Sequence, residues 1–159
     1  MQVKNGKKCL VDRFDDTGVW IGAFYKGKLV SCLRMLSRDR SGPLDIEGYK
    51  SSKAKEVQNV LQIENIVECQ RCVTKKQVRG LGLNCLVLAI AGKICIPQNI
   101  SAIATSQSWF NTFDYGDIVY DEFDYGDGVL TNVIHYTPET MKGLFKLLMI
   151  EKTADLAKK

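Results

Sequence analysis

The apolar positions near the start of the chain predict a β-hairpin. Val19 to Phe24 and Leu29 to Leu36 are runs of apolar and β-branched residues, which favour extended structure. Tyr25-Lys-Gly-Lys28 between them is a short connection with a glycine where a positive φ is needed. Beyond the hairpin the pattern weakens. Ser37 to Tyr49 carries Ser-Gly-Pro and many charges, which predicts a loop, and Ser52 to Leu61 has weak helical character.

A strand, a glycine-bearing turn and a helix are predicted in the middle of the chain. Ile66 to Val73 has strand character, and Lys75 to Gly82 is polar and turn-like. Apolar residues then recur at helical spacing, at Leu83, Leu86, Val87, Ile90 and Ile94. Pro97-Gln-Asn99 ends that helix, and Ile100 to Thr105 resumes as a buried strand. A β-α-β order generates parallel pairing, so a mixed α/β sheet is predicted.

The last third of the chain predicts another hairpin and a helix. Ile118 to Phe123 and Val129 to Tyr136 are strand candidates on either side of Asp124-Tyr-Gly-Asp-Gly128, a strong turn signal. Thr137 is a plausible N-cap and Pro138 suits the first helical position, so an amphipathic helix is expected over about residues 138–152.

Composition restricts the classes of protein that fit this pattern. The chain has 159 residues, 45% hydrophobic and 25% charged, which predicts one domain over 1–159 with its own core. No apolar run approaches the roughly 20 residues of a membrane span, and no secretion signal is recognisable, so a cytoplasmic location is expected. The six cysteines are then expected to be reduced thiols. The net charge is +4, but the basic residues do not form a stripe interleaved with aromatic residues, so no nucleic-acid partner is predicted. A small anionic ligand is compatible with this charge.

The most informative segment is the glycine loop, Gln77-Val-Arg-Gly-Leu-Gly82, between a predicted strand and a predicted helix. Gly80 and Gly82 let the backbone curl so that successive N–H groups point at an anion. The helix adds the positive end of its dipole, and Arg79 could add charge, so a pyrophosphate would be held mainly by backbone donors. The alternative is a flexible turn before a helix, with no ligand. The spacing matches neither a Rossmann nor a Walker loop.

The pattern Gln/Arg-x-x-Gly-x-Gly/Ala between strand and helix resembles the pyrophosphate loop of the GNAT superfamily of acyltransferases. That resemblance implies a three-layer α/β fold with a mixed, mostly antiparallel central sheet, splayed around the cofactor site. It also implies an acyl donor, acyl-coenzyme A or the phosphopantetheine of an acyl carrier protein. The implied cofactor-binding residues are Gln77, Val78, Arg79, Gly80, Leu81 and Gly82.

A second set of residues resembles a narrower group, the acyl-homoserine-lactone (autoinducer) synthases and the related N-acyl amino acid synthases. The segments are Asp12-Arg-Phe-Asp-Asp16, Arg34-Met-Leu36 and Glu68-Cys-Gln-Arg71, in the order and approximate spacing of those families. The resemblance covers about residue 12 to about residue 115. Two positions depart from the lactone synthases, because Leu10 replaces an acidic residue and Gln70 replaces a serine. These departures weigh against S-adenosylmethionine as the acceptor.

Carried over residue by residue, the resemblance makes Glu68 the general base or the carboxylate that orients the amine. Arg34 and Arg71 would position it, while Asp12 and Asp15 would shape the acceptor side. The chemistry agrees, since an amine must lose a proton as it attacks a thioester. Tyr115 follows the strand that splays in GNAT folds and is a candidate general acid, with aromatic packing as the alternative.

Structural roles remain open for several of these residues. Glu68 and Arg71 could be an ion pair flanking a strand, and Arg34 could be a solvated residue at a strand end. Cys69-x-x-Cys72 lacks the second ligand pair that zinc needs, so no metal is predicted. His135, the only histidine, is expected to be structural.

Three functions follow from these residues. The preferred one is an N-acyltransferase that acts on a small-molecule amine, with an acyl carrier protein as a candidate partner and an oligomer compatible with the sequence. The second is a non-catalytic module that binds a ligand or a partner protein. The third is a shortened lactone synthase that uses S-adenosylmethionine.

Overall fold

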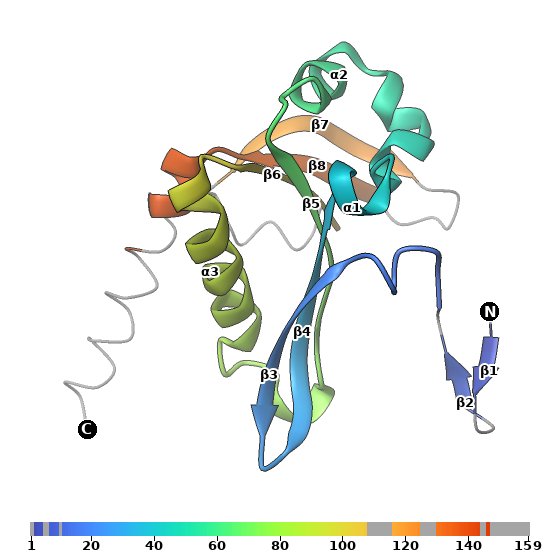
Figure 1. Ribbon diagram of the computed structural model, residues 1–159, viewed down its shortest axis with the longest axis vertical. Coiled ribbons are helices and arrows are strands. Elements are labelled where there is room, and N and C mark those ends of the chain that lie inside the picture. The colour runs from blue at the N-terminus through green and yellow to red at the C-terminus, as the bar shows by residue number, and fades with distance from the viewer. Residues whose placement is uncertain are drawn as a thin grey trace.

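The computed structural model describes residues 2–4, 7–9, 11–107, 116–124, 130–143 and 146. Six strands form one open sheet in the order β3-β4-β5-β6-β8-β7 (Figure 1). Their bounds are β3 (Val19–Tyr25), β4 (Lys28–Ser37), β5 (Ile66–Thr74), β6 (Ser101–Gln107), β7 (Asp117–Asp124) and β8 (Leu130–Tyr136). A separate two-stranded sheet pairs β1 (Gln2–Lys4) with β2 (Lys7–Cys9). The sequence pattern predicted the six strands of the main sheet but not β1 and β2.

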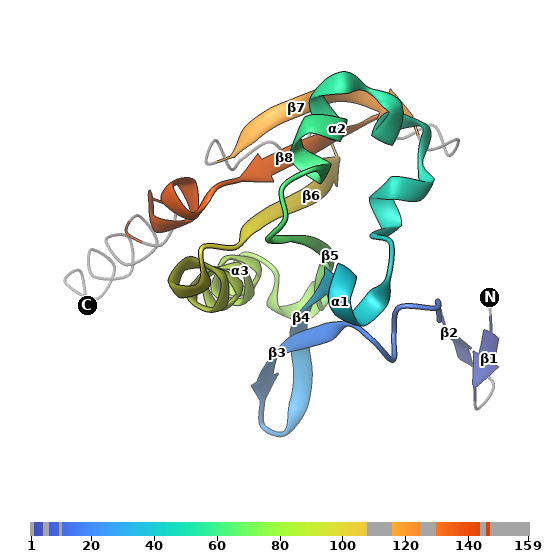
Figure 2. The same cartoon turned by 45° about the horizontal axis from the view of Figure 1, so that its top comes forward.

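The sheet is mixed and mostly antiparallel, as predicted. β5 and β6 are parallel neighbours, whereas the other four adjacent pairs are antiparallel. The parallel pairing is short, because it joins Ile66–Cys69 to Ser101–Ala104 and then stops. Both strands continue beyond that point, to Thr74 and Gln107. The sheet is therefore splayed between β5 and β6, and the two strands run apart in Figure 2.

The helices cover the two faces of the sheet. The long helix α3 (Leu83–Cys95) lies on one face, and the short helices α1 (Arg38–Ser41) and α2 (Lys55–Leu61) lie on the other side in Figure 1. Residues 138–143 are also helical. There the Thr140 amide donates to Oγ1 of Thr137 at 3.2 Å, so the predicted N-cap is confirmed. The rest of the helix predicted over 138–152, apart from residue 146, lies outside the described residues.

The prediction of a loop from Ser37 to Tyr49 was wrong in part. This segment contains α1 and a 3-10 turn, Asp45–Gly48. Gly42 ends α1 with a φ of 70°, and its amide donates to the Arg38 carbonyl. A helix of four residues is too short to produce a helical hydrophobic period, so the sequence pattern could not predict it.

Two buried clusters pack against the two faces, because side chains alternate along each strand. Ile66 of β5 belongs to the cluster under α2, and its neighbour Val67 belongs to the cluster under α3. The α2 cluster contains Phe14, Leu36, Leu44, Ile46, Val57, Val60, Ile66, Ile103 and Val133. The α3 cluster contains Ile21, Leu33, Met35, Val67, Val87, Ala91, Cys95, Ala102 and Met141. Three layers result, and no described helix is long and apolar enough to cross a membrane.

Leu36 tests the α2 cluster, since its side chain is 0% exposed. Leu36→Ala should lower the free energy of unfolding by about 2–5 kcal/mol, because a buried cavity replaces the lost packing. Leu29→Ala is the matched control, because Leu29 is 41% exposed on the same hairpin and its loss should cost less than about 1 kcal/mol. Urea unfolding of both variants gives the comparison. Equal losses would contradict the assignment of Leu36 to the core.

Candidate active site

A buried arginine lies at the centre of the site. Arg34 is in the middle of β4, between Trp20 of β3 and Gln70 of β5, and is 0% exposed. Its Nη1 donates to Oδ1 of Asp12 and to Oδ1 of Asp15, both at 2.6 Å. Its Nη2 donates to Oδ2 of Asp12 at 2.9 Å and to Oε1 of Gln70 at 2.5 Å. The alternative of a solvated residue at a strand end is therefore wrong, and the charge is compensated by two carboxylates.

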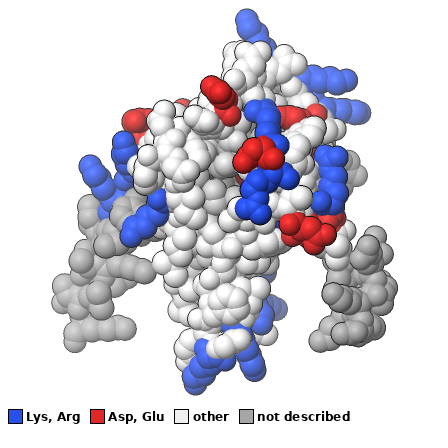
Figure 3. Space-filling model, viewed as in Figure 1, with Lys and Arg blue, Asp and Glu red and all other residues white. Residues whose placement is uncertain are grey.

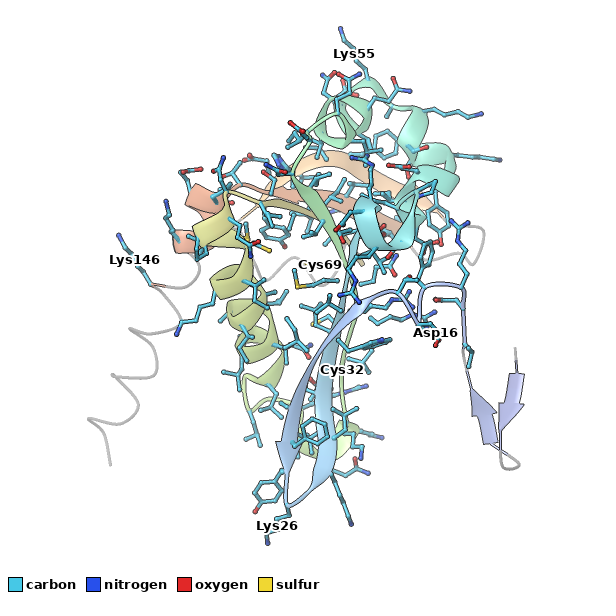
Figure 4. The ribbon with its side chains drawn as sticks, in the orientation of Figure 1. Asp16, Lys26, Cys32, Lys55, Cys69 and Lys146 are labelled. Atoms are coloured by element: carbon cyan, nitrogen blue, oxygen red, sulfur yellow. The ribbon has the colours of Figure 1, made fainter. Side chains whose placement is uncertain are left out.

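The turn before β3 is shaped to present those carboxylates. Oδ1 of Asp12 accepts the Phe14 amide at 2.9 Å, and the Asp12 amide donates to Oδ2 of Asp15 at 3.1 Å. Gly18 then passes so close to the arginine that a Cβ there would lie 2.8 Å from Cγ of Arg34. Only glycine leaves room for this approach. In Figure 4 the neighbouring Asp16 lies on the outside of the turn, away from the network.

Arg71 joins the same network from a bulge in β5. Gln70 pairs with Arg34 and Val73 pairs with Cys32, so two residues of β5 oppose one of β4. Arg71 has a φ of 51°, and its Nη2 donates to Oδ2 of Asp12 at 2.7 Å. The alternative of a Glu68–Arg71 ion pair is wrong, because the partner of Arg71 is Asp12. Hydrogen bonds from Arg34 hold the pKa of Asp12 well below its usual range against the opposing effect of burial, and Arg71 adds to the lowering.

Glu68 lies on the same face of β5, two residues from Gln70, and is 2% exposed. Its Oε1 accepts Nε2 of Gln70 at 2.7 Å, and its Oε2 accepts the Ile46 amide at 3.1 Å. Burial raises the pKa of Glu68 to about 7, and the two hydrogen bonds oppose the rise. A carboxyl group with a pKa near neutrality can both take and give a proton at physiological pH.

Gln70 connects the arginine to Glu68, and sequence reasoning missed this role. Its Nε2 also donates to Oδ2 of Asp45 at 2.9 Å, so one amide bridges Arg34, Glu68 and Asp45. Arg34 thus reaches Glu68 through Gln70, and Arg71 joins the same network through Asp12. Because side chains alternate along a strand, Glu68 and Gln70 lie on the same face of β5, and this spacing could have predicted their contact. No signal in the sequence pointed to Asp45.

The glycine loop lies at the far end of β5, immediately before α3. Val78 donates its amide to the Lys75 carbonyl at 3.0 Å within a 3-10 turn, Lys76–Val78. Gly80 and Gly82 have φ values of 82° and 70°, and a Cβ on either would meet no atom within 4 Å. The first bond of α3 runs from the Leu86 amide to the Gly82 carbonyl at 3.0 Å. Among the residues that the structure describes, no protein group accepts from the amides of residues 80–84.

Three side chains fix the start of α3 against the sheet. Ser31 of β4 and Thr74 of β5 are both buried, and their hydroxyls lie 2.8 Å apart. Oδ1 of Asn84, in the first turn of α3, accepts from both hydroxyls. Because β5 carries Thr74 and Glu68, the mouth of α3 is held in a fixed relation to the carboxylate.

A small apolar cavity lies on the α3 side of the sheet, next to the splay. Its lining residues are Cys69, Leu88, Ala91, Gly92, Cys95, Ala102, Tyr136 and Met141. Figure 4 shows Cys69 directed from β5 toward α3. Burial raises the pKa of Tyr136 to about 12 and that of the Cys69 thiol higher still, so both groups stay protonated at neutral pH. Cavity and Glu68 thus lie on opposite faces of β5.

The remaining candidate residues lie apart from this network or outside the described residues. Tyr115 lies outside the described residues. His135 is half-buried in β8, and burial lowers its pKa. Arg79 is exposed, and its Nε donates to the Thr74 carbonyl at 3.3 Å. Within the described chain, no three His, Cys, Asp or Glu side chains are grouped so that they could hold a metal ion.

The fold is similar to solved structures of acyltransferases. FeeM, an N-acyl amino acid synthase from uncultured soil microbes, gives a TM-score of 0.63 over 80% of this chain and 76% of its own, at 9% identity. BjaI, a coenzyme A-dependent acyl-homoserine-lactone synthase solved with S-adenosylmethionine and isopentyl-CoA, gives 0.58 over 86% and 67%, at 16% identity. An acyl-CoA N-acyltransferase from Pseudomonas aeruginosa gives 0.51 over 74% and 67%, at 15% identity.

At these identities the likeness is one of fold. The GNAT-like fold with a mixed, mostly antiparallel sheet, expected from the resemblance of the glycine loop, is thereby confirmed. No family model and no curated protein matches the sequence.

Glu68→Gln tests the buried carboxyl through stability. The pKa of Glu68 is about 7 in the folded chain against an ordinary 4.5, so the unfolded chain ionises first as pH rises. As pH rises from 4.5 to about 7, the free energy of unfolding of the wild type should therefore fall relative to that of Glu68→Gln by a total on the order of 3 kcal/mol. Above pH 7 the difference should stay constant. Urea unfolding across this range measures it. A constant difference between the two proteins would contradict the raised pKa.

Proposed function

We propose that the protein is an N-acyltransferase, which moves an acyl group from a coenzyme A or carrier-protein thioester to a small amine. The observation that carries the proposal is the position of two features on one strand. β5 bears the buried Glu68 on one face and leads directly into the glycine loop, and it parts from β6 between them. A donor bound at the loop and an acceptor bound at Glu68 would therefore meet along β5, where its pairing with β6 ends.

The donor side is supported by the free amides at the mouth of α3. Residues 80–84 offer backbone N–H groups without partners in the described chain, and the helix dipole adds positive potential there. Gly80 and Gly82 leave open space where side chains would otherwise stand. Val78 and Arg79 use their amides within the turn, so the anion site is narrower than the whole Gln77–Gly82 segment. The pantetheine arm would run from this site into the splay.

The acceptor side is supported by its charges. Asp12, Asp15, Asp45 and Glu68 supply four carboxyl groups against the two guanidinium groups of Arg34 and Arg71. An excess of carboxylates favours a cationic amine over an anionic acceptor. The lowered pKa keeps Asp12 ionised, whereas Glu68 near pH 7 remains free to exchange a proton. The two acids therefore have different roles, since Asp12 remains an ionised carboxylate and Glu68 accepts and donates protons.

The transfer step follows from this arrangement. The bound ammonium group first releases one proton to solvent. The neutral nitrogen then attacks the thioester carbonyl carbon, the C–N bond forms and the C–S bond breaks. The amine proton passes to Glu68, directly or through a water, and a proton then returns to the leaving thiolate. Oε1 of Glu68 accepts from Gln70 and Oε2 accepts from the Ile46 amide, and a carboxylate has about four lone-pair sites, so it can still accept the amine proton. Amides of the splayed part of β5 would stabilise the oxyanion. The apolar cavity beside Cys69 suits the end of the acyl chain.

Gly80→Val tests the donor site. A branched side chain at a φ of 82° is strained and would cover the loop amides, so affinity for coenzyme A should fall at least about tenfold. Gly42→Val is the matched control, since Gly42 also has a positive φ of 70° and open space but closes α1. It should lose similar stability and keep its affinity. Calorimetric titration measures both. Unchanged affinity in Gly80→Val would contradict the donor site.

Glu68→Gln also tests the catalytic role. The variant cannot accept the amine proton, so turnover should fall about 100-fold or more while donor affinity stays nearly constant. In the wild type, turnover should rise with pH through about 7 and then level off, because the ionised carboxylate is the active form. Mass spectrometry of amide products from a mixed amine panel gives the rate. A variant with wild-type turnover would remove Glu68 from the mechanism.

The same panel separates the alternative functions. A non-catalytic binding module would bind coenzyme A and form no amide with any amine. A shortened lactone synthase would form product only with S-adenosylmethionine, which is therefore included in the panel.

A further inference from the structure

The charges of the chain are strongly segregated. No acidic residue occurs from Thr17 to Arg38 or from Cys69 to Phe113. The first stretch forms the β3–β4 hairpin, and the second begins with the end of β5, the glycine loop and α3. Exposed cations gather where these meet, at Lys26, Lys28, Lys75, Lys76 and Arg79. Figure 3 shows this lower end of the molecule in blue and white, without red.

Large apolar side chains are exposed among these cations. Phe24 is 69% exposed, Tyr25 62% and Leu29 41%, all near the tip of the hairpin. Phe24 and Leu29 are cross-strand partners, and both approach Gly22, so they form one patch. Leu81, in the glycine loop, is 70% exposed. Exposed apolar side chains that cluster in one patch, as Phe24 and Leu29 do, are typical of a binding surface.

The hairpin and the glycine loop belong to one surface. The Lys75 amide, at the start of the loop, donates to the Val30 carbonyl of β4 at 2.9 Å. The hairpin extends past the loop in both ribbon views (Figures 1 and 2). A partner that seats on the hairpin would therefore also cover the approach to the loop.

We propose that the hairpin tip, Phe24 to Leu29, docks an acidic acyl carrier protein whose phosphopantetheine arm enters at the glycine loop. This inference rests on the proposed function and names the form of its donor. Charge complementarity selects an acidic partner, and Phe24 with Leu29 supplies the apolar contact that such a partner would bury. The connection to the loop favours a carrier protein over an anionic membrane. A bilayer on the hairpin would block the loop, while a carrier protein delivers its thioester there.

Charge reversal of the hairpin tests the docking surface. Lys26→Glu combined with Lys28→Glu should weaken binding of a holo acyl carrier protein at least about tenfold, and added salt should weaken the wild-type complex in the same way. Phe24→Ser should also weaken it. Lys53→Glu with Lys55→Glu is the matched control, since both lysines are exposed near α2 at the other end of the molecule, and its effect should stay below about twofold. Calorimetric titration with the holo carrier protein, and separately with coenzyme A, measures all variants.

The outcomes separate the surface from its rivals. The proposal is overturned if charge reversal of the hairpin leaves the affinity for the carrier protein unchanged. It is also overturned if the reversal lowers the affinity for coenzyme A by the same factor, because the lysines would then bind the nucleotide. Binding of vesicles containing phosphatidylglycerol through the same lysines, with no carrier-protein binding, also overturns it. If Gly80→Val weakens coenzyme A binding but the hairpin variants bind the carrier protein normally, the docking surface is wrong and the proposed function stands. If Gly80→Val leaves the affinity for coenzyme A unchanged, the donor site of the proposed function is wrong.

Discussion

The buried guanidinium of Arg34 is the interaction on which the site depends. An unpaired charge at 0% exposure would be prohibitively costly, so the N-terminal turn must bring Asp12 and Asp15 against it. Gly18 lets that turn approach closely, and Phe14 and Trp20 place their rings within 5.7 Å and 5.5 Å of the guanidinium carbon. The arginine thereby ties a segment that is not part of the main sheet to the strands that carry Glu68 and Gln70.

β5 divides the chemistry between the two faces of the sheet. Its first half is paired on both sides and buries Glu68 toward α2, while its second half leaves β6, bulges at Arg71 and leads to α3. The bulge turns Arg71 onto Asp12, so this irregularity brings a second guanidinium group into the network around Arg34. Opposite charges also separate along the molecule. Carboxylates lie around Arg34 and Glu68, whereas the charged residues at the described glycine loop are cations.

Much of the fold could be predicted from the sequence, because strand alternation and the β-α-β order are local signals. The glycine loop was recognised by its place between a strand and a helix, whereas the other candidate site residues came from the resemblance to known synthases. The contacts that join them were not predicted, since Gln70 meets Asp45 across 25 positions of sequence and α1 is too short to leave a period. Arg71 shows the limit most clearly, because nothing in the letters Glu-Cys-Gln-Arg indicates a left-handed backbone at the arginine. That conformation is imposed by its pairing with Asp12 and by the strand register.

The backbone amides of residues 80–84 offer the most direct test of the account. Nuclear magnetic resonance of the labelled protein, titrated with coenzyme A, reports on each of these N–H groups separately. Strong shifts confined to this segment, with slower exchange of its amide protons, are the predicted result, since these donors would then bond to the pyrophosphate. Saturating coenzyme A that leaves these five amides unchanged would contradict a donor held at the mouth of α3.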